Sequence, residues 1–324
     1  MPGFFSQLIL SRALSIMLLA FALLNGLSPA LAETSKKTRQ IQFPKQSLGR
    51  LYDIKPGVDW IQVKIPYGQF YGTAANLVTV PQSARLLLEL DANIADEPKI
   101  LNAVPADALF SMRAKNLEPN AELLPAISRL TGLHRLDIID CVTNDKDVAC
   151  LARLHQLERL SLNSCGLNGD CLSELMHLNK LKYLNISSNM LNSKSSFYIS
   201  KMPNLTCLDL ARTRLTDADL RYLSKLTNLT FLNINSNQDL TSKGFAALRS
   251  LKKLDLLYAQ NTAIKTGDLV ALKGLPIHTI FMPKLRMQQA ELNELHRTFP
   301  NCKIIMQNNK AGSDDKVIFA PVSR

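Results

Sequence analysis

Cysteine and histidine are the side chains of this 324-residue sequence best suited to metal or redox chemistry. The six cysteines are Cys141, Cys150, Cys165, Cys171, Cys207 and Cys302, and the five histidines are His134, His155, His177, His278 and His296. A zinc site usually contains a closely spaced pair such as C-x-x-C, and the sequence has none. Cys165 and Cys171 have no suitably placed histidine. We therefore expect neither a metal site nor a cofactor.

Motifs for nucleophilic or phosphate chemistry are missing as well. The sequence contains no G-x-S-x-G, P-loop, H-E-x-x-H or Rossmann glycine pattern. The histidines are scattered, and His155 and His177 are expected to be solvated surface residues. A site could still assemble from residues distant in sequence, but no spare domain would house it. We therefore expect that the protein is not an enzyme.

A pattern of leucines repeats along most of the chain and must position these side chains. In Leu205–Asn228, LTCLDLARTRLTDADLRYLSKLTN, leucines occupy offsets 0, +3 and +5, as in a half-buried strand. Thr213, at +8, can hydrogen-bond the turn backbone. Thr216 and Asp217 are typical of a helix N-cap, and leucines three residues apart follow on one helical face. The unit is a strand, a turn and a helix.

Nine such units follow one another in phase. They start at Arg85, Leu109, Leu133, Leu157, Leu181, Leu205, Leu229, Leu254 and Ile277. The step is 24 residues up to Leu229, then 25, then 23. One unit has two apolar edges that it cannot bury alone, so the units must stack into a solenoid.

The segment Leu215–Leu229, LTDADLRYLSKLTNL, resembles the bacterial leucine-rich repeats with L-T-D-x-x-L units, which are related in fold to ribonuclease-inhibitor-like horseshoes. The resemblance implies an α/β solenoid with a parallel β-sheet on the concave side and helices on the convex side. It also implies a protein-binding role, which is common among proteins of that fold. The chain departs from the pattern at Leu191–Ile199, where NSKSSFYI replaces the usual helix start, and at Pro283 in the ninth unit.

Residues 1–32 have the features of a secretory signal peptide. An apolar run from Ala13 to Leu24 follows the single charged residue Arg12, and Ala30-Leu31-Ala32 is an A-x-A cleavage site. The alternative is a membrane anchor, but the run is short for a bilayer. We expect cleavage near Ala32, no membrane span afterwards, and export to the periplasm, the cell surface or the extracellular space.

The remaining segments flank the repeats. Residues 33–84 predict a flexible start and a small β-rich N-terminal cap, which contains the single tryptophan, Trp60, and covers an apolar end of the solenoid. The leucine-rich-repeat domain occupies residues 85–300. Residues 301–324 predict a terminal edge strand at Cys302–Met306 and a disordered tail.

The concave face should carry the residues at offsets +2 and +4 of each strand, stacked on those of the next strand. Its early part gathers arginines and its late part gathers apolar and aromatic residues: Arg113, Arg135, Arg159, Tyr183, Phe231, Leu256, Tyr258 and Phe281. Exposed aromatic side chains near arginines are typical of binding hot spots. The alternative is that they merely stack along the sheet. We expect a protein or peptide to dock across the fifth to ninth strands, with Arg135 and Arg159 selecting it electrostatically.

Three cysteines could matter on this framework. Cys141 and Cys165 both lie at +8 of successive units, so they could form a disulfide or could simply replace the asparagine or threonine of that turn position. Cys207 is expected to be an exposed thiol on the concave face.

The net charge of +11 permits binding of anionic polymers. The charges are dispersed, with no run of five lysines or arginines, so a solvated surface is also compatible and no nucleic acid is expected as partner. The sequence thus predicts an exported, non-catalytic scaffold that binds an unidentified protein or peptide. The alternative is a cell-envelope structural protein that holds an anionic envelope polymer through its basic surface.

Overall fold

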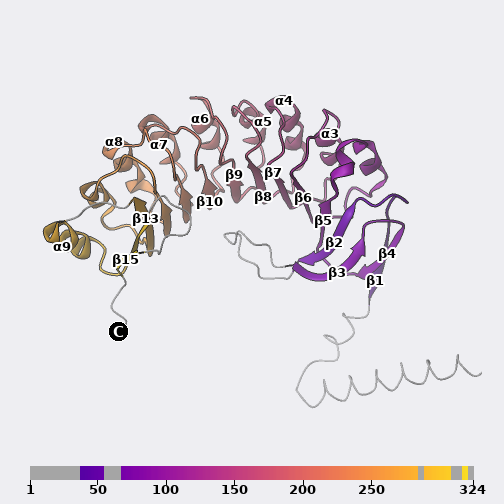
Figure 1. The fold of residues 1–324 in the computed structure, drawn as a ribbon, viewed down its shortest axis with the longest axis horizontal. Coiled ribbons are helices and arrows are strands. Elements are labelled where there is room, and N and C mark those ends of the chain that lie inside the picture. The colour runs from indigo at the N-terminus through magenta and orange to yellow at the C-terminus, as the bar shows by residue number, and fades with distance from the viewer. Residues whose placement is uncertain (1–36, 55–66, 284–287, 308–315, 320–324) are drawn as a thin grey trace, which may run out of the picture.

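The computed structural model describes residues 37–54, 67–283, 288–307 and 316–319. The expected signal peptide and Trp60 lie outside these ranges. The described chain forms an arc, with strands along the inner side and helices along the outer side (Figure 1). This is the predicted solenoid.

Nine parallel strands line the concave face, one from each predicted unit. They are β5 (Leu86–Leu90), β6 (Ser111–Lys115), β7 (Arg135–Ile139), β8 (Arg159–Asn163), β9 (Tyr183–Asn185), β10 (Cys207–Asp209), β11 (Phe231–Asn233), β12 (Leu256–Tyr258) and β13 (Thr279–Pro283). Neighbouring strands pair at the predicted phase. Phe231 pairs with Leu256 across the 25-residue step, and Leu256 pairs with Thr279 across the 23-residue step. The one-residue insertion and the one-residue deletion therefore lie outside the strands and leave the sheet register intact.

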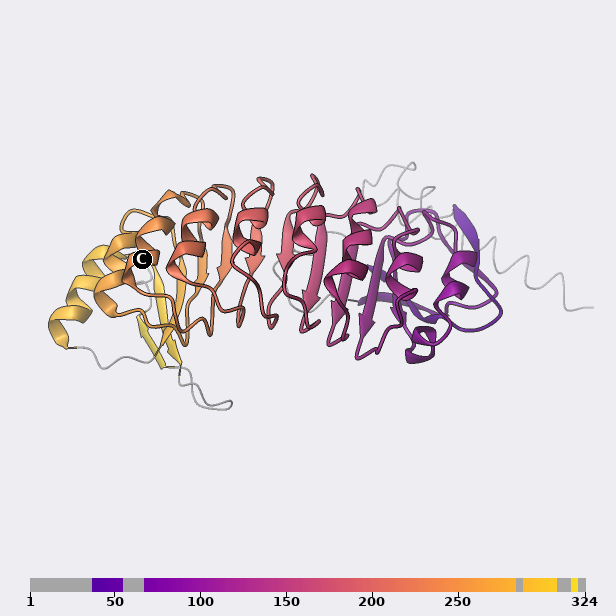
Figure 2. The same cartoon turned by 90° about the horizontal axis from the view of Figure 1, so that it is seen from above.

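Short helical segments lie side by side on the convex surface (Figure 2). They are η1 (Ala92–Ala95), η2 (Pro98–Ala103), α3 (Leu123–Ile127), α4 (Asp145–Val148), η3 (Ala149–Arg153), α5 (Leu172–Leu175), α6 (Ser195–Ile199), α7 (Asp217–Leu223), α8 (Ser242–Phe245), η4 (Ala246–Ser250), η5 (Thr266–Leu272) and α9 (Gln289–Thr298). A capping box at Thr216 and Asp219 starts α7, as the sequence predicts for this N-terminus. The atypical segment at residues 191–199 still forms a helix, α6. Among the described residues, no helix is long and apolar enough to cross a membrane.

The first strands close the N-terminal end of the solenoid. They are β1 (Thr38–Gln42), β2 (Gly49–Ile54), β3 (Tyr67–Thr73) and β4 (Leu77–Pro81). β2 pairs antiparallel with β5 and β3, whereas β1 and β4 form a separate two-stranded antiparallel sheet. Phe43, Leu48 and Leu51 are buried in the same apolar cluster as the leucines of the repeats. One continuous core therefore joins these strands to the solenoid.

The C-terminal end carries β14 (Lys303–Gln307) and β15 (Lys316–Phe319). β14 continues the parallel sheet, and β15 pairs antiparallel with its outer side. The structure differs here from the sequence prediction. The Cys302–Met306 region is not the sheet edge, and part of the expected disordered tail is a strand, whose Val317 and Phe319 pair with Ile305 and Ile304.

Seven strands of the repeats leave the sheet through a left-handed residue. The residue at offset +7 has a φ between 52° and 58° in seven units: Asn116, Asp140, Ser164, Ser188, Arg212, Ser236 and Asn261. L-residues other than glycine, asparagine and aspartate adopt this conformation at a cost of about 1 kcal/mol. In six of these seven units, the side chain of the next residue, at +8, hydrogen-bonds backbone groups.

Asparagine at +8 joins adjacent repeats. The side chain of Asn237 is 1% exposed. Its Oδ1 accepts from the backbone N–H groups of Thr213 (3.1 Å) and Leu215 (2.9 Å), which belong to the preceding repeat. Its Nδ2 donates to the carbonyls of Leu210 and Ile234, both at 2.9 Å, and of Asn235 at 3.3 Å. Asn189 makes the equivalent five contacts two repeats earlier in the chain.

Candidate binding surface on the concave face

The concave face contains the two columns of residues that the repeat phase predicts. The +2 column runs through Arg135, Arg159, Tyr183, Cys207, Phe231, Leu256 and Thr279, and the +4 column through Glu89, Arg113, Asp137, Ser161, Asn185, Asp209, Asn233, Tyr258 and Phe281. The exposure of these residues differs greatly between the two halves of the face.

In the N-terminal half, the arginines are held in an ion-pair ladder. Arg113 Nη1 lies 3.2 Å from Glu89 Oε1, and Arg113 Nη2 lies 3.6 Å from Asp137 Oδ2. Arg159 Nε donates to the other oxygen of Asp137 at 3.1 Å, and its guanidinium lies 3.7 Å from the centre of the Tyr183 ring. Asp137 is thus shared by two arginines that come from the strands on either side of it.

The exposure expected for part of this group is wrong. Arg135, Arg159 and Tyr183 are 5%, 7% and 7% exposed. Burial alone would lower the pKa of Arg159, but the charge of Asp137 reverses this and raises the pKa. Burial and the adjacent charge of Arg159 lower the pKa of Arg135. Because a guanidinium stays protonated at physiological pH, both buried arginines keep their charge.

In the C-terminal half, three aromatic rings from neighbouring strands lie against one another. The Phe231 and Tyr258 ring centres lie 5.6 Å apart, and those of Tyr258 and Phe281 lie 4.1 Å apart with nearly parallel planes. Together with Leu256, all three are half-buried. We call these four residues the aromatic surface. The sequence prediction brings them together correctly, since they lie in adjacent positions of the two columns.

A half-buried carboxylate borders the aromatic surface. Burial raises the pKa of Asp209, although the N–H of Ala211 (3.0 Å) and the side chain of Asn233 stabilise its charge. Burial, and then the charge of Asp209, raise the pKa of Tyr258. The tyrosine is therefore a neutral hydrogen-bonding group at the edge of an apolar surface.

Two comparisons bear on the family of the chain. Residues 203–245 match the family model described as Leucine Rich repeats (2 copies). The crystal structure of an internalin (InlF) from Listeria monocytogenes str. 4b F2365 superposes with a TM-score of 0.50 at 21% identity. This chain is a leucine-rich-repeat protein.

The likeness to the internalin concerns the fold. It covers 66% of this leucine-rich-repeat protein and 63% of the internalin chain. The chain therefore spans less than two thirds of the length of the internalin. No curated protein matches the sequence.

The cysteines of this leucine-rich-repeat protein serve as packing residues. Cys141 and Cys165 are free and buried. The thiol of Cys165 donates to the carbonyls of Ile138 and Asn163, both at 3.4 Å, much as Asn237 does in its own repeat. The structure therefore shows cysteine replacing asparagine at the turn position, and the disulfide that the spacing allows is not formed. Burial raises the pKa of Cys165 to about 12.

Cys207 also differs from its predicted role. It is 2% exposed, so the expectation of an exposed thiol on the concave face is wrong. The hydroxyl of Thr206 lies 3.8 Å from its sulfur. Among the described residues, no group of three histidine, cysteine, aspartate or glutamate side chains could hold a metal ion.

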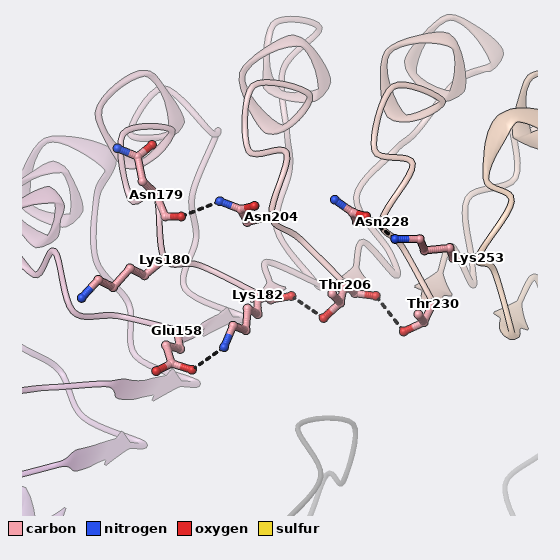
Figure 3. Close-up of a pocket in the computed structure, with 9 residues that line it drawn as sticks. All are labelled: Glu158, Asn179, Lys180, Lys182, Asn204, Thr206, Asn228, Thr230 and Lys253. Carbon is pink, nitrogen blue, oxygen red and sulfur yellow. Dashed lines mark hydrogen bonds and ion pairs between the residues drawn. The ribbon is translucent and has the colours of Figure 1, made fainter.

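Sequence reasoning missed one polar groove of the leucine-rich-repeat protein. It lies where the chain enters strands β8 to β12, and nine polar residues line it (Figure 3). Most of them occupy offsets −1 and +1 of successive units, outside the columns that face the concave side. The signal was present in the repeat phase, but Lys253 lies 71 residues after Lys182, and the charges form no run in the sequence.

Proposed function

We propose that this leucine-rich-repeat protein is a non-catalytic scaffold that binds a protein or peptide on its concave face, with the aromatic surface as the contact. The observation that carries the proposal is the contact of the Tyr258 ring with the rings of Phe231 and Phe281, all three of which are half-exposed. Mutual packing fixes the rings, so little side-chain entropy is lost when a partner covers them. Aromatic residues of this kind dominate the energetics of protein interfaces.

The buried arginines have a different role in this proposal. Arg113 and Arg159 fix the N-terminal half of the face through Asp137. They shape the rigid sheet next to the aromatic surface. Because Arg135 and Arg159 are buried, their charges would select a partner only at long range, without direct contact.

Export is part of the proposal. The apolar run and the A-x-A site in residues 1–32 support a cleaved signal peptide and a mature chain that begins at Glu33. Mass spectrometry of the protein purified from its native host tests this directly. An intact N-terminus in the purified protein would contradict it.

The binding test compares two aromatic deletions on opposite faces. The first variant carries Phe231→Ser, Tyr258→Ser and Phe281→Ser on the concave face. The matched control carries Phe197→Ser and Tyr222→Ser, which are exposed on α6 and α7 of the convex face. Circular dichroism first shows that both fold.

Proteins of the native envelope and extracellular fractions are then passed over each immobilised chain, and a retained species is purified and titrated. The proposal predicts wild-type affinity for the convex control and at least a tenfold loss for the concave variant. Equal affinity of the two variants would refute it.

A further inference from the structure

The entry sides of the strands form a polar rim on one edge of the solenoid. The groove in this rim has a volume of about 490 Å³. Its lining residues are Glu158, Asn179, Lys180, Lys182, Asn204, Thr206, Asn228, Thr230 and Lys253. We call it the rim groove. It is distinct from the aromatic surface, which faces the inside of the arc.

Hydrogen bonds between successive repeats fix the neutral side chains of the rim groove. Nδ2 of Asn204 donates to the carbonyl of Asn179 at 2.7 Å, and the hydroxyl of Thr206 donates to the carbonyl of Lys182 at 3.2 Å. The hydroxyl of Thr230 repeats this contact one unit later, on Thr206. Figure 3 shows these side chains in two rows across adjacent repeats. The groove is therefore built before any ligand arrives.

The charge of the rim groove is positive at both ends. Lys182 Nζ forms an ion pair with Glu158 at 3.0 Å. Lys180 Nζ instead contacts Gln156 Oε1 at 2.6 Å, and Lys253 Nζ contacts Asn228 Oδ1 at 2.7 Å. An amide oxygen holds the ammonium group in place without neutralising its charge. Three lysines and one glutamate leave the lining with a net positive charge.

The two positive ends are separated by neutral polar residues. Lys180 and Lys182 lie just before β9, and Lys253 lies just before β12, three strands further on. Three strand spacings correspond to about 14 Å. A ligand that contacts both ends must be an extended molecule with several anionic groups.

The lining also indicates the kind of polyanion. No aromatic side chain is among the described residues that line the groove, whereas single-stranded nucleic acids bind on aromatic stacking platforms and protein partners on aromatic anchors. Amide and hydroxyl groups between the lysines match a ligand rich in hydroxyl groups, and the lysine stems and threonine methyls can pack on its C–H surfaces. We propose that the rim groove binds an acidic polysaccharide, with ammonium groups on its carboxylates and amides on its hydroxyls.

The test uses the full chain and oligogalacturonate as the probe, titrated by calorimetry at about 50 mM salt. The double variant Lys180→Gln, Lys253→Gln removes both amide-held charges. The matched control Lys201→Gln, Lys225→Gln removes two exposed charges that lie over Phe197 and Tyr222 of the convex face. The proposal predicts at least tenfold weaker binding for the rim variant and less than twofold change for the control. The affinity of the wild type should fall as salt rises.

A second set of measurements separates a specific site from general charge attraction. Neutral dextran, polyglutamate and oligothymidylate are titrated in parallel, and Asn204→Ala tests the neutral part of the groove. The proposal predicts that oligogalacturonate binds at least tenfold tighter than the other three and that Asn204→Ala weakens it severalfold. Absence of oligogalacturonate binding, equal losses in both lysine variants, or equal affinity for polyglutamate or oligothymidylate would overturn it.

Discussion

The asparagine at offset +8 should be one of the most sensitive positions for stability. Replacing Asn237 with alanine removes five hydrogen bonds in a fully buried place. The N–H groups of Thr213 and Leu215 lose their acceptor, and each buried N–H without a partner costs about 1–3 kcal/mol. We therefore expect Asn237→Ala to lower the free energy of unfolding by about 4 kcal/mol, with two unpaired donors as the main cause.

Urea unfolding followed by circular dichroism measures this change. Asn237→Cys serves as a matched variant because Cys141 and Cys165 occupy the same turn position in their repeats. It keeps a weak donor for the Leu210 carbonyl and should lose less stability than alanine. The exposed neighbour variant Gln238→Ala should change the free energy of unfolding by less than about 0.5 kcal/mol.

The shape of the unfolding curve also matters. Repeats interact mainly with their neighbours, so a weakened joint can let the two halves of the solenoid unfold separately. Such uncoupling would appear as a lower m-value or a second transition. A single transition with an unchanged m-value and a loss below about 1 kcal/mol would refute the reasoning.

Four further outcomes are expected. Asp137→Ala removes the carboxylate that Arg159 needs and should cost about 3–5 kcal/mol in urea unfolding, because a buried guanidinium loses its partner; a loss below about 1 kcal/mol would contradict the ladder. Burial raises the pKa of Asp209 in the folded state, so the folded state holds this proton more tightly than the unfolded state does. The resulting contribution of Asp209 to the free energy of unfolding is present at low pH and is lost as pH rises through the folded pKa. Asp209→Asn should therefore stabilise the protein at pH 7, and the gain should vanish below the unfolded pKa of about 4, which paired unfolding curves at the two pH values will show. The half-exposed Cys150 should react with a thiol reagent before the five buried cysteines, as mass mapping of the labelled peptides can establish, and early labelling at any other site would count against the structure. Arg212→Gly should raise the free energy of unfolding by about 0.5 kcal/mol and the midpoint of thermal unfolding slightly, because the left-handed strain that it relieves exceeds the chain entropy that glycine adds to the unfolded state. A lower midpoint would contradict this.

The repeat phase alone was sufficient to predict the sheet. Leucines at fixed offsets place Phe231 beside Leu256 and Tyr258 beside Phe281, and the observed register matches even where the step changes from 24 residues. The pattern works because every unit buries the same offsets against the same neighbours. It says nothing of the residue at +7, since Ser188 or Arg212 adopts a left-handed conformation against its own preference.

Side-chain pairing across repeats was harder to predict. Arg135 and Arg159 occupy one column, so the sequence suggested a charged, solvated face. The structure instead places Asp137 directly opposite Arg113 and diagonally from Arg159. Its ion pair with Arg159 allows that arginine to be buried. The rim groove escaped for a related reason. Lys180 and Lys253 are far apart in sequence, and they line the same groove only because the intervening repeats are stacked.

Strands from outside the repeats occupy both ends of the sheet and set a limit on its growth. A parallel strand of a repeat can always accept another identical repeat, so a bare array could add copies of itself end to end and form fibres. β2 runs antiparallel to β5, and β15 runs antiparallel to β14. The outermost strands of the sheet are β3 and β15, and neither presents a neighbouring molecule with the repeat's matching leucines. The number of repeats between the end strands can change by duplication or loss, while the same end strands keep the molecule from polymerising.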